Sequence, residues 1–186
     1  MALVSVRLPY SEKRKILVGW AQKASQFQTA ADNIGQTFSR AMAGLSWITV
    51  LKKRENYRKA FDNFNARKIV KYDEKKIAAL LQDAGIIRNK LKINATIQNA
   101  KAYLAVQKEF GSFDKYIWQF TNHKTIVNRP KTLSNILPKT PESDAMSKDL
   151  LKRGFKFVGS TICYAYMQAT GMVNDHVADC YLAVTD

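Results

Sequence analysis

The sequence predicts an all-α protein, and two observations support this prediction. Apolar residues recur at the spacing of a helix, in steps of four, three and four along Ile93, Ile97, Ala100 and Leu104, as one buried helix face requires. By contrast, no segment alternates cleanly between polar and apolar residues, and no Asn-Gly or Asp-Gly pair indicates a β-hairpin. We expect a compact domain of several short helices that pack at steep angles.

Glycines and an irregular stretch mark the ends of the first helices. The first helix presents one apolar face, formed by Trp47, Val50 and Leu51. Gly111 ends the long helix that carries the apolar repeat, and residues 113–120 are expected to form a shorter helix. Residues 121–139 contain two prolines and are expected to be mostly irregular.

Two further helices follow near the C-terminus. The first begins at Thr140-Pro141-Glu142, which supplies an N-cap oxygen, a proline at the first helical position and an acidic first turn. Gly154 closes this helix, Gly159 precedes the next one, and Gly171 ends it. Two helices joined by a short glycine-bounded turn are therefore predicted.

Charge is the strongest compositional signal. The 186 residues include 30 Lys and Arg against 15 Asp and Glu, which gives a formal net charge of +15. Such a charge favours nucleic acid or an anionic membrane surface as the partner, although a soluble protein with surplus lysine would show the same composition. The length suffices to bury a core without disulfides or metals.

The sequence also predicts the compartment. No stretch approaches the roughly 20 apolar residues of a membrane span, and the apolar start of the chain is too short for a signal peptide. The only cysteines, Cys163 and Cys180, do not make a disulfide scaffold. We expect a cytoplasmic protein without membrane association, and a monomer.

The turn between Gly154 and Gly159 is the first candidate site.

 Glycine lets the backbone come close to a surface, and the free N–H groups at the start of the second helix suit a phosphate. Lys152, Arg153 and Lys156 surround this position with positive charge. A helix-hairpin-helix grips one DNA strand in this way without reading its sequence. An ordinary helical corner with exposed lysines fits the same spacing equally well.

His176 and Cys180 form a second candidate site. They stand four residues apart, so one helical turn would place both on the same face as a pair of zinc ligands. Zinc needs about four ligands, and only His123 and Cys163 remain in the chain. Cys163 lies in an apolar helical stretch and is expected in the core, whereas His123 lies in a polar loop. The residues alone therefore do not favour an intact His/Cys zinc site.

Trp47 is a third candidate, because it follows a bend at Gly44. A tryptophan in this position can stack on a nucleobase. At helical spacing, however, a tryptophan is more often part of the core. The position alone leaves both interpretations open.

Four segments together resemble 3-methyladenine DNA glycosylase I, a bacterial family of helix-hairpin-helix enzymes. They occur in the family's order between about Ala43 and Cys180. The combination of GFKFVG with VNDH and, after three intervening residues, Cys is specific to this family. The segments are AGLSWITVLKKRENYRKAF (43–61), LLQDAGIIRNKLKI (80–93), SDAMSKDLLKRGFKFVG (143–159) and TICYAYMQATGMVNDHVADC (161–180).

The resemblance implies a base-excision-repair enzyme that binds double-stranded DNA containing alkylated bases. Such an enzyme flips 3-methyladenine out of the stack and hydrolyses its N-glycosidic bond. Methylation at N3 makes the base cationic and its glycosidic bond labile, so the pocket need not supply a powerful nucleophile. An aromatic wall adds cation–π attraction to the cationic base.

The resemblance also implies roles for individual residues. Trp47 matches the base-stacking tryptophan, and Leu45 matches the wedge that fills the gap left by the flipped nucleotide. His176 and Cys180 match the C-terminal half of the family's zinc site. The phosphate-gripping hairpin is matched by Gly154, Lys156, Val158 and Gly159.

Residues 1–42 do not match the family. The family's N-terminal part supplies the other two zinc ligands, aromatic pocket walls and a glutamate that reads the base edge. Here no Cys precedes Cys163 and no His precedes His123, and the place of the glutamate falls on Ser39, beside Arg40. Two unit charges about 4 Å apart interact by about 4 kcal/mol at an effective dielectric near 20, so Arg40 would oppose a cationic base. We therefore assign no catalytic residue.

Two functions follow from this comparison. The first is an active DNA-3-methyladenine glycosylase, and the alternative is a catalytically impaired DNA-binding relative that lacks the glutamate and half of the zinc site. The expected organisation is a divergent segment at 1–42 and a glycosylase-like helical domain at 43–186, together forming one structural domain. One hypothesis for the mismatch is a shifted reading frame or substituted start, which the nucleotides of the gene would decide.

Overall fold

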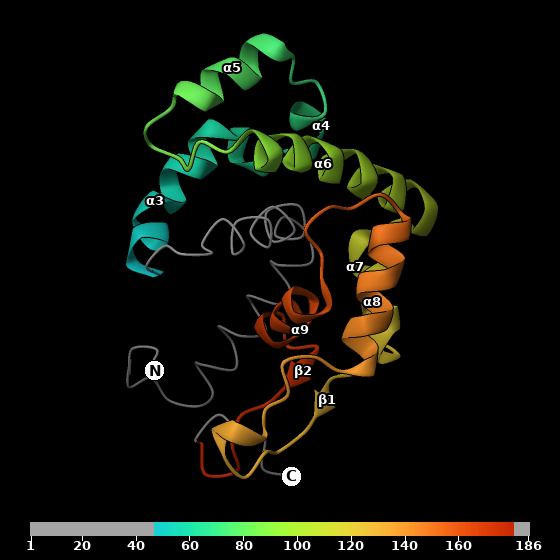
Figure 1. Ribbon diagram of the computed structural model, residues 1–186. Coiled ribbons are helices and arrows are strands. Elements are labelled where there is room, and N and C mark those ends of the chain that lie inside the picture. The colour runs from blue at the N-terminus through green and yellow to red at the C-terminus, as the bar shows by residue number, and fades with distance from the viewer. Residues whose placement is uncertain (1–46, 181–186) are drawn as a thin grey trace.

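The computed structural model describes residues 47–180, with side chains from residue 53 onward. This part of the chain contains seven α-helices, and Figure 1 shows their arrangement. The α-helices are α3 (Trp47–Ala60), α4 (Ala66–Ile69), α5 (Glu74–Gln82), α6 (Lys90–Phe110), α7 (Phe113–Trp118), α8 (Pro141–Lys152) and α9 (Ser160–Ala169). Three 3-10 turns lie between them, namely η2 (Asp62–Phe64), η3 (Gln119–Thr121) and η4 (Leu133–Asn135).

The predicted all-α class is confirmed, with one small addition. Two short strands, β1 (Ile126–Val127) and β2 (Val173–Asn174), pair in parallel, with Ile126 opposite Val173. Strands of two residues are too short to show alternation, so the sequence pattern gave no signal for them. The pair ties the irregular stretch 121–139 to the segment that follows α9.

Helix α6 is the central element of the described structure. The side chain of Asn89 caps its start by accepting a hydrogen bond from the Lys92 N–H, and Gly111 ends it at a φ of 79°. Of the predicted apolar face, Ile93, Ile97 and Ala100 are buried. Leu104, the fourth member, is partly buried against the same cluster.

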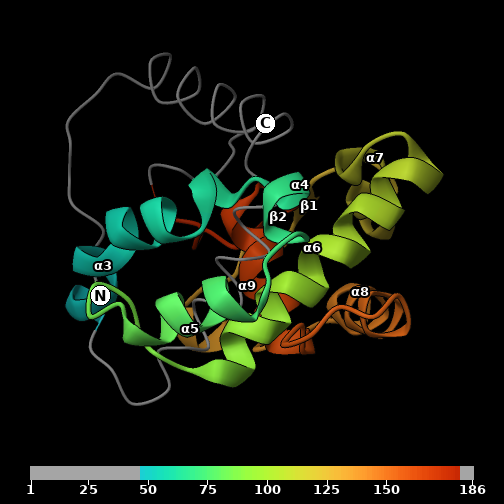
Figure 2. The same ribbon diagram turned by 90° about the horizontal axis from the view of Figure 1, so that it is seen from above.

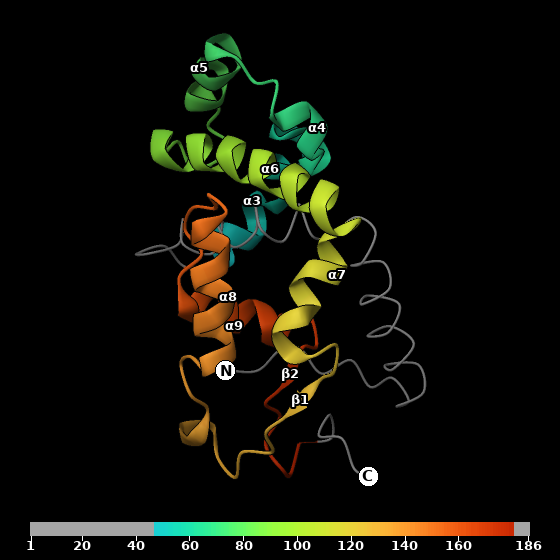
Figure 3. The same cartoon turned by 90° about the vertical axis from the view of Figure 1, so that its right-hand side faces the viewer.

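The core consists of two clusters that meet at α6. One packs α3, α4 and α5 against the N-terminal half of α6, and the other packs α7, α8, α9 and β2 against its C-terminal half. Tyr103 of α6 contacts both clusters. Figures 1 and 3 show α5 on one side of α6 and α8 and α9 on the other. Seen from above in Figure 2, α3, α4 and α5 gather around one half of α6, and α7 and α8 lie toward the other.

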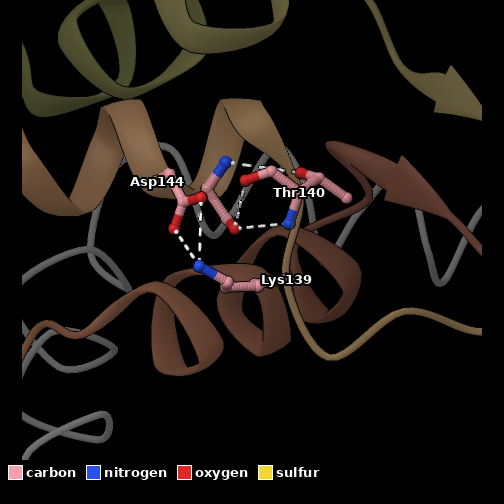
Figure 4. A network of polar contacts seen from close by, with 4 residues as sticks. Lys139, Thr140 and Asp144 are labelled. Atoms are coloured by element: carbon pink, nitrogen blue, oxygen red, sulfur yellow. Dashed lines mark hydrogen bonds and ion pairs between the residues drawn. The ribbon is translucent and has the colours of Figure 1, made fainter.

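The predicted helix starts are explained by local capping. Residues 113–120 were expected as one helix, and they form α7 followed by the tighter turn η3. At α8, the Thr140 N–H donates to Ser143 Oγ at 2.9 Å, and the Ser143 N–H donates to Thr140 Oγ1 at 3.4 Å (Figure 4). This reciprocal capping box confirms the start predicted at Thr140-Pro141.

Within residues 47–180, no helix combines the length and apolar character that crossing a membrane requires.

Candidate nucleic-acid interface

Residues 153–159 join α8 to α9 and are called the α8–α9 turn. It leaves α8 through a Schellman motif, in which the Phe155 N–H donates to the Leu150 carbonyl and the Gly154 N–H to the Leu151 carbonyl, both at 3.0 Å. Gly154 has a φ of 91°, and a Cβ there would lie 3.3 Å from Gln98 Nε2 on α6. Position 154 therefore requires glycine for its left-handed backbone and tolerates a side chain poorly.

The start of α9 leaves hydrogen-bond donors free for an anion. Gly159 is the N-cap residue, and among the described residues no side chain caps this helix. The first N–H groups of a helix have no partner within it, and the positive end of the helix dipole lies beside them. The first turn of α9 also contains no acidic residue. The start of α9 thus has the open backbone donors that the predicted phosphate site requires.

One carboxylate does lie beside this helix start. The side chain of Asp144 on α8 accepts a hydrogen bond from Ser160, which is the main reason why its pKa is lowered. Figure 4 shows Lys139 pointing toward the same carboxylate, with Nζ 3.3 Å from Asp144 Oδ2. Lys139 therefore offsets a negative charge that would otherwise oppose a phosphate at α9.

The positive charge around the turn comes from two lysines and not from three basic residues. Lys152 and Lys156 are exposed. The expectation that Arg153 adds to this charge is wrong, because its guanidinium donates to both oxygens of Glu109 at 2.7 and 3.2 Å and to Asp149 Oδ2 at 2.7 Å. The hydrogen bond to Glu109 is also the largest reason why the pKa of Arg153 is raised.

Val158, a predicted DNA contact, has its side chain in the core with 1% of its surface exposed. Its carbonyl accepts hydrogen bonds from Ser147 Oγ at 2.7 Å and from Cys163 Sγ at 3.3 Å. A contact from this residue to DNA would therefore have to come from its backbone. Lys156 and Gly159, by contrast, lie at accessible positions of the turn.

The predicted base-pocket residues lie at the edge of the described structure. Trp47 is the first residue of α3, and its side chain lies outside the described residues, as do Leu45 and Ser39. The C-terminal half of α3 is fixed to the segment before α6, because buried Tyr57 accepts a hydrogen bond from the Ile87 N–H at 3.0 Å. Burial raises the pKa of Tyr57 despite that hydrogen bond. The roles of Trp47 and Leu45 stay predictions.

His176 and Cys180 lie close together, but in an irregular segment and not on the helical turn that the sequence analysis considered. Residues 175–180 form an irregular turn, closed by a 2.8 Å hydrogen bond from the Cys180 N–H to the Val177 carbonyl. Within it, Cys180 Sγ lies 3.6 Å from His176 Nδ1. Zinc bonds of about 2.1 Å to nitrogen and 2.3 Å to sulfur, at a tetrahedral angle, place the two ligand atoms roughly 3.6 Å apart. The pair therefore fits half of a tetrahedral zinc site.

The described residues do not supply the other half. Among residues 53–180, no group of three or more His, Cys, Asp and Glu side chains could hold a metal ion. Cys163 is confirmed as a core residue, since it is fully buried and burial raises the pKa of its thiol to about 12. A thiol that stays protonated is a poor zinc ligand. The described part of the chain thus does not complete a zinc site.

Sequence reasoning missed Asp175, which holds the segment before the His176–Cys180 turn. Its carboxylate accepts hydrogen bonds from Tyr164 at 2.6 Å, from Gln168 at 2.7 Å and from Asn128 at 2.7 Å. Burial opposes the charged form, but these hydrogen bonds outweigh it and lower the pKa of Asp175. Asn128 is 47 residues away in sequence, so only the fold could show this contact.

The fold and the α8–α9 turn define a class, namely a basic helical protein whose α9 begins without a side-chain cap, as helices that bind phosphate often do. A family model described as methyladenine glycosylase matches residues 36–183. The chain belongs to the methyladenine glycosylase family. The match begins at residue 36, seven residues before Ala43, at which the resemblance was expected to begin.

Individual relatives agree with the family match. The chain is 55% identical over 138 residues to DNA-3-methyladenine glycosylase 1 of Escherichia coli, which covers 74% of each protein. A crystal structure of 3-methyladenine DNA glycosylase I superposes with a TM-score of 0.77 at 44% identity, covering 86% of this chain and 87% of the other. A point variant of 3-methyladenine DNA glycosylase I, in complex with 3-methyladenine, gives a TM-score of 0.78 at 28% identity, covering 87% and 86%.

Proposed function

We propose that this protein is a DNA-3-methyladenine glycosylase of base excision repair. It binds duplex DNA that contains alkylated bases, flips out 3-methyladenine and hydrolyses its N-glycosidic bond. The observation that carries this proposal is the 55% identity over 138 residues to the Escherichia coli enzyme of that name. The likeness to a solved complex with 3-methyladenine supports the same substrate.

In this proposal α8, the α8–α9 turn and α9 form a helix-hairpin-helix that holds the DNA backbone. The uncapped start of α9 supplies N–H donors to a phosphate, and Gly159 at its N-cap adds no side chain there. Gly154 contributes indirectly, because its left-handed backbone closes the turn against Gln98 on α6. Lys156 and Lys152 add positive charge, which attracts the phosphates of any DNA sequence. These contacts with the DNA backbone position the duplex but do not recognise the lesion.

We assign recognition of the lesion to Trp47, the first residue of α3, and to Leu45, which precedes it. Leu45 fills the space that the flipped nucleotide leaves, and Trp47 stacks on the extruded base. Because 3-methyladenine is cationic, stacking on an indole adds about 1–2 kcal/mol of cation–π attraction when the pair is desolvated. The leaving base is already activated by its methyl group, so water completes the hydrolysis once the base is held.

The proposal includes a zinc site only as a half site. His176 and Cys180 would hold the ion, whose contribution would be to tie the C-terminal turn to other parts of the chain. The protein is further proposed to act as a monomer in the cytoplasm.

A second candidate function is DNA binding without base release. The observations that favour it are Ser39 at the place of the family glutamate and the lack, among residues 53–180, of side chains that complete a zinc site with His176 and Cys180. In that case the α8–α9 turn keeps its affinity for the DNA backbone, and the pocket no longer distinguishes a methylated base. The protein would then bind damaged and undamaged duplexes equally.

The test is base release from DNA methylated with dimethyl sulfate. Purified protein is incubated with this DNA, and the released bases are separated by chromatography. We expect free 3-methyladenine well above the level released in buffer alone. A folded protein that binds the duplex but releases no base above that level would exclude the glycosylase and support the second function.

A further inference from the structure

The backbone of the α8–α9 turn is held by Asn99, a polar residue in the middle of α6. Asn99 has only 1% of its surface exposed. Its Oδ1 accepts a hydrogen bond from the Lys156 N–H at 2.7 Å, and its Nδ2 donates to the Lys156 carbonyl at 3.1 Å. One buried side chain thus fixes both backbone polar groups of the residue at the centre of the turn.

Ser147 on α8 holds the turn at a second point. Its Oγ is buried and donates to the Val158 carbonyl at 2.7 Å. Asn99 and Ser147 therefore each bind one carbonyl of the turn, so the Lys156 and Val158 carbonyls point toward the protein interior. Between these two points lies Phe157, a residue other than glycine with a φ of 60°, a conformation that costs free energy unless its surroundings enforce it.

The direction of these carbonyls decides where the next N–H groups point. In a trans peptide the C=O and the following N–H point in opposite directions, and the described chain contains no cis peptide. Since the Lys156 carbonyl points toward Asn99, the Phe157 N–H points away from it. By the same reasoning, the Gly159 N–H points away from Ser147. Neither N–H donates to a backbone carbonyl within the described part of the chain.

We propose that Asn99 is a positioning residue for DNA binding, which turns the backbone donors of the α8–α9 turn outward and orients Lys156 toward a phosphate. It does not touch DNA itself. This inference rests on the proposed function for its ligand, the sugar–phosphate backbone of duplex DNA. It adds that the affinity of the turn is set by a buried amide on a different helix.

The test uses Asn99→Leu, which fills a similar volume without the two hydrogen bonds. The probes are fluorescein-labelled duplexes, one undamaged and one with a central tetrahydrofuran abasic site, followed by anisotropy at several salt concentrations. We expect both dissociation constants to rise at least about tenfold. In single-turnover base release, the protein concentration for half-maximal rate rises accordingly, while the rate at saturation stays within about twofold of the parent.

A matched control separates positioning from general destabilisation. Ile69 is fully buried in the other core cluster, away from the α8–α9 turn, so Ile69→Val lowers stability without touching the turn. It should leave both dissociation constants unchanged. Amide hydrogen exchange gives a second readout, because the Lys156 N–H should lose its protection in Asn99→Leu and keep it in Ile69→Val.

The outcomes distinguish this inference from the proposed function. Unchanged duplex affinity in Asn99→Leu would overturn the inference even if the parent protein releases 3-methyladenine. If the parent binds duplex without base release and Asn99→Leu weakens that binding, the glycosylase proposal fails and the positioning role stands. A parent protein that binds neither duplex would overturn both.

Discussion

Arg153, at the end of α8, forms a two-pronged ion pair with Glu109, near the end of α6 and 44 residues earlier in the chain. The same guanidinium donates to Asp149 and lies over the rings of Phe110 and Tyr116, about 5 Å from each centroid (4.9 and 5.0 Å). These contacts join α6, α7 and α8 just before the α8–α9 turn begins. Arg153 is therefore a structural residue, although its position in the sequence is typical of a DNA contact.

The first prediction concerns this network. Arg153→Met should lower the free energy of unfolding by about 1–2 kcal/mol, because three hydrogen bonds to carboxylates are lost from a side chain that is 24% exposed. Urea unfolding measures the change. The salt dependence of DNA binding should stay the same, since two carboxylates already neutralise this charge. Lys152→Met, at an exposed position one residue earlier, is the control and should change stability by less than about 0.5 kcal/mol.

Lys156 should contribute to DNA binding through its charge. If its ammonium neutralises one phosphate, Lys156→Ala makes the negative slope of log affinity against log salt concentration shallower by about 0.9. The slope is measured by anisotropy with an undamaged duplex. Lys75→Ala provides the comparison, because Lys75 is exposed on α5, on the other side of α6. Equal slopes for the Lys156 and Lys75 variants would contradict a phosphate contact at the turn.

Trp47 should matter for the base and not for the backbone grip. Trp47→Ala is expected to reduce release of 3-methyladenine at least about tenfold, as loss of stacking on a desolvated cation predicts. Affinity for undamaged duplex should remain that of the parent protein. A variant that loses affinity and cooperative unfolding together would instead indicate that Trp47 belongs to the core.

Zinc should bind weakly if His176 and Cys180 are its only protein ligands. The purified protein, dialysed against a chelator and then analysed for metals, should retain clearly less than one zinc per chain. Cys180→Ser should remove whatever zinc is retained, whereas Cys163→Ser should not. Stoichiometric zinc after dialysis would mean that other residues complete the site.

Acid should weaken the structure through Asp149. Burial alone would raise the pKa of Asp149, but hydrogen bonds from Tyr116 and Arg153 outweigh it and lower the pKa. A carboxyl group with a lowered pKa stabilises the fold above its unfolded pKa of about 3.9, and this stabilisation is lost as the pH falls below about 4. Asp149→Asn should therefore flatten the fall in stability between about pH 5 and pH 2. The same change at exposed Asp179 serves as the control.

The prediction from sequence succeeded where the cause is local. The start of α8 at Thr140 and its end at Gly154 depend on residues within a few positions, so composition and spacing indicated them. His176 and Cys180 lie close together as their spacing allows, but not on a helix, because Asp175 holds the segment through Asn128, just after β1, and Tyr164 on α9. Spacing alone could not distinguish an irregular turn from a helix that brings the same two side chains together.

The sequence by itself determined the all-α class, the ends of α8 and α9, the positive charge and the family. Only the tertiary structure decided which basic residues around the α8–α9 turn are free, and that Asn99 and Ser147 fix its backbone. Asn99 and Lys156 are 57 residues apart, and Arg153 and Glu109 are 44 apart. Hydrogen bonds and ion pairs act over a few ångströms, so pairs so distant in sequence interact only because packing on α6 brings them together.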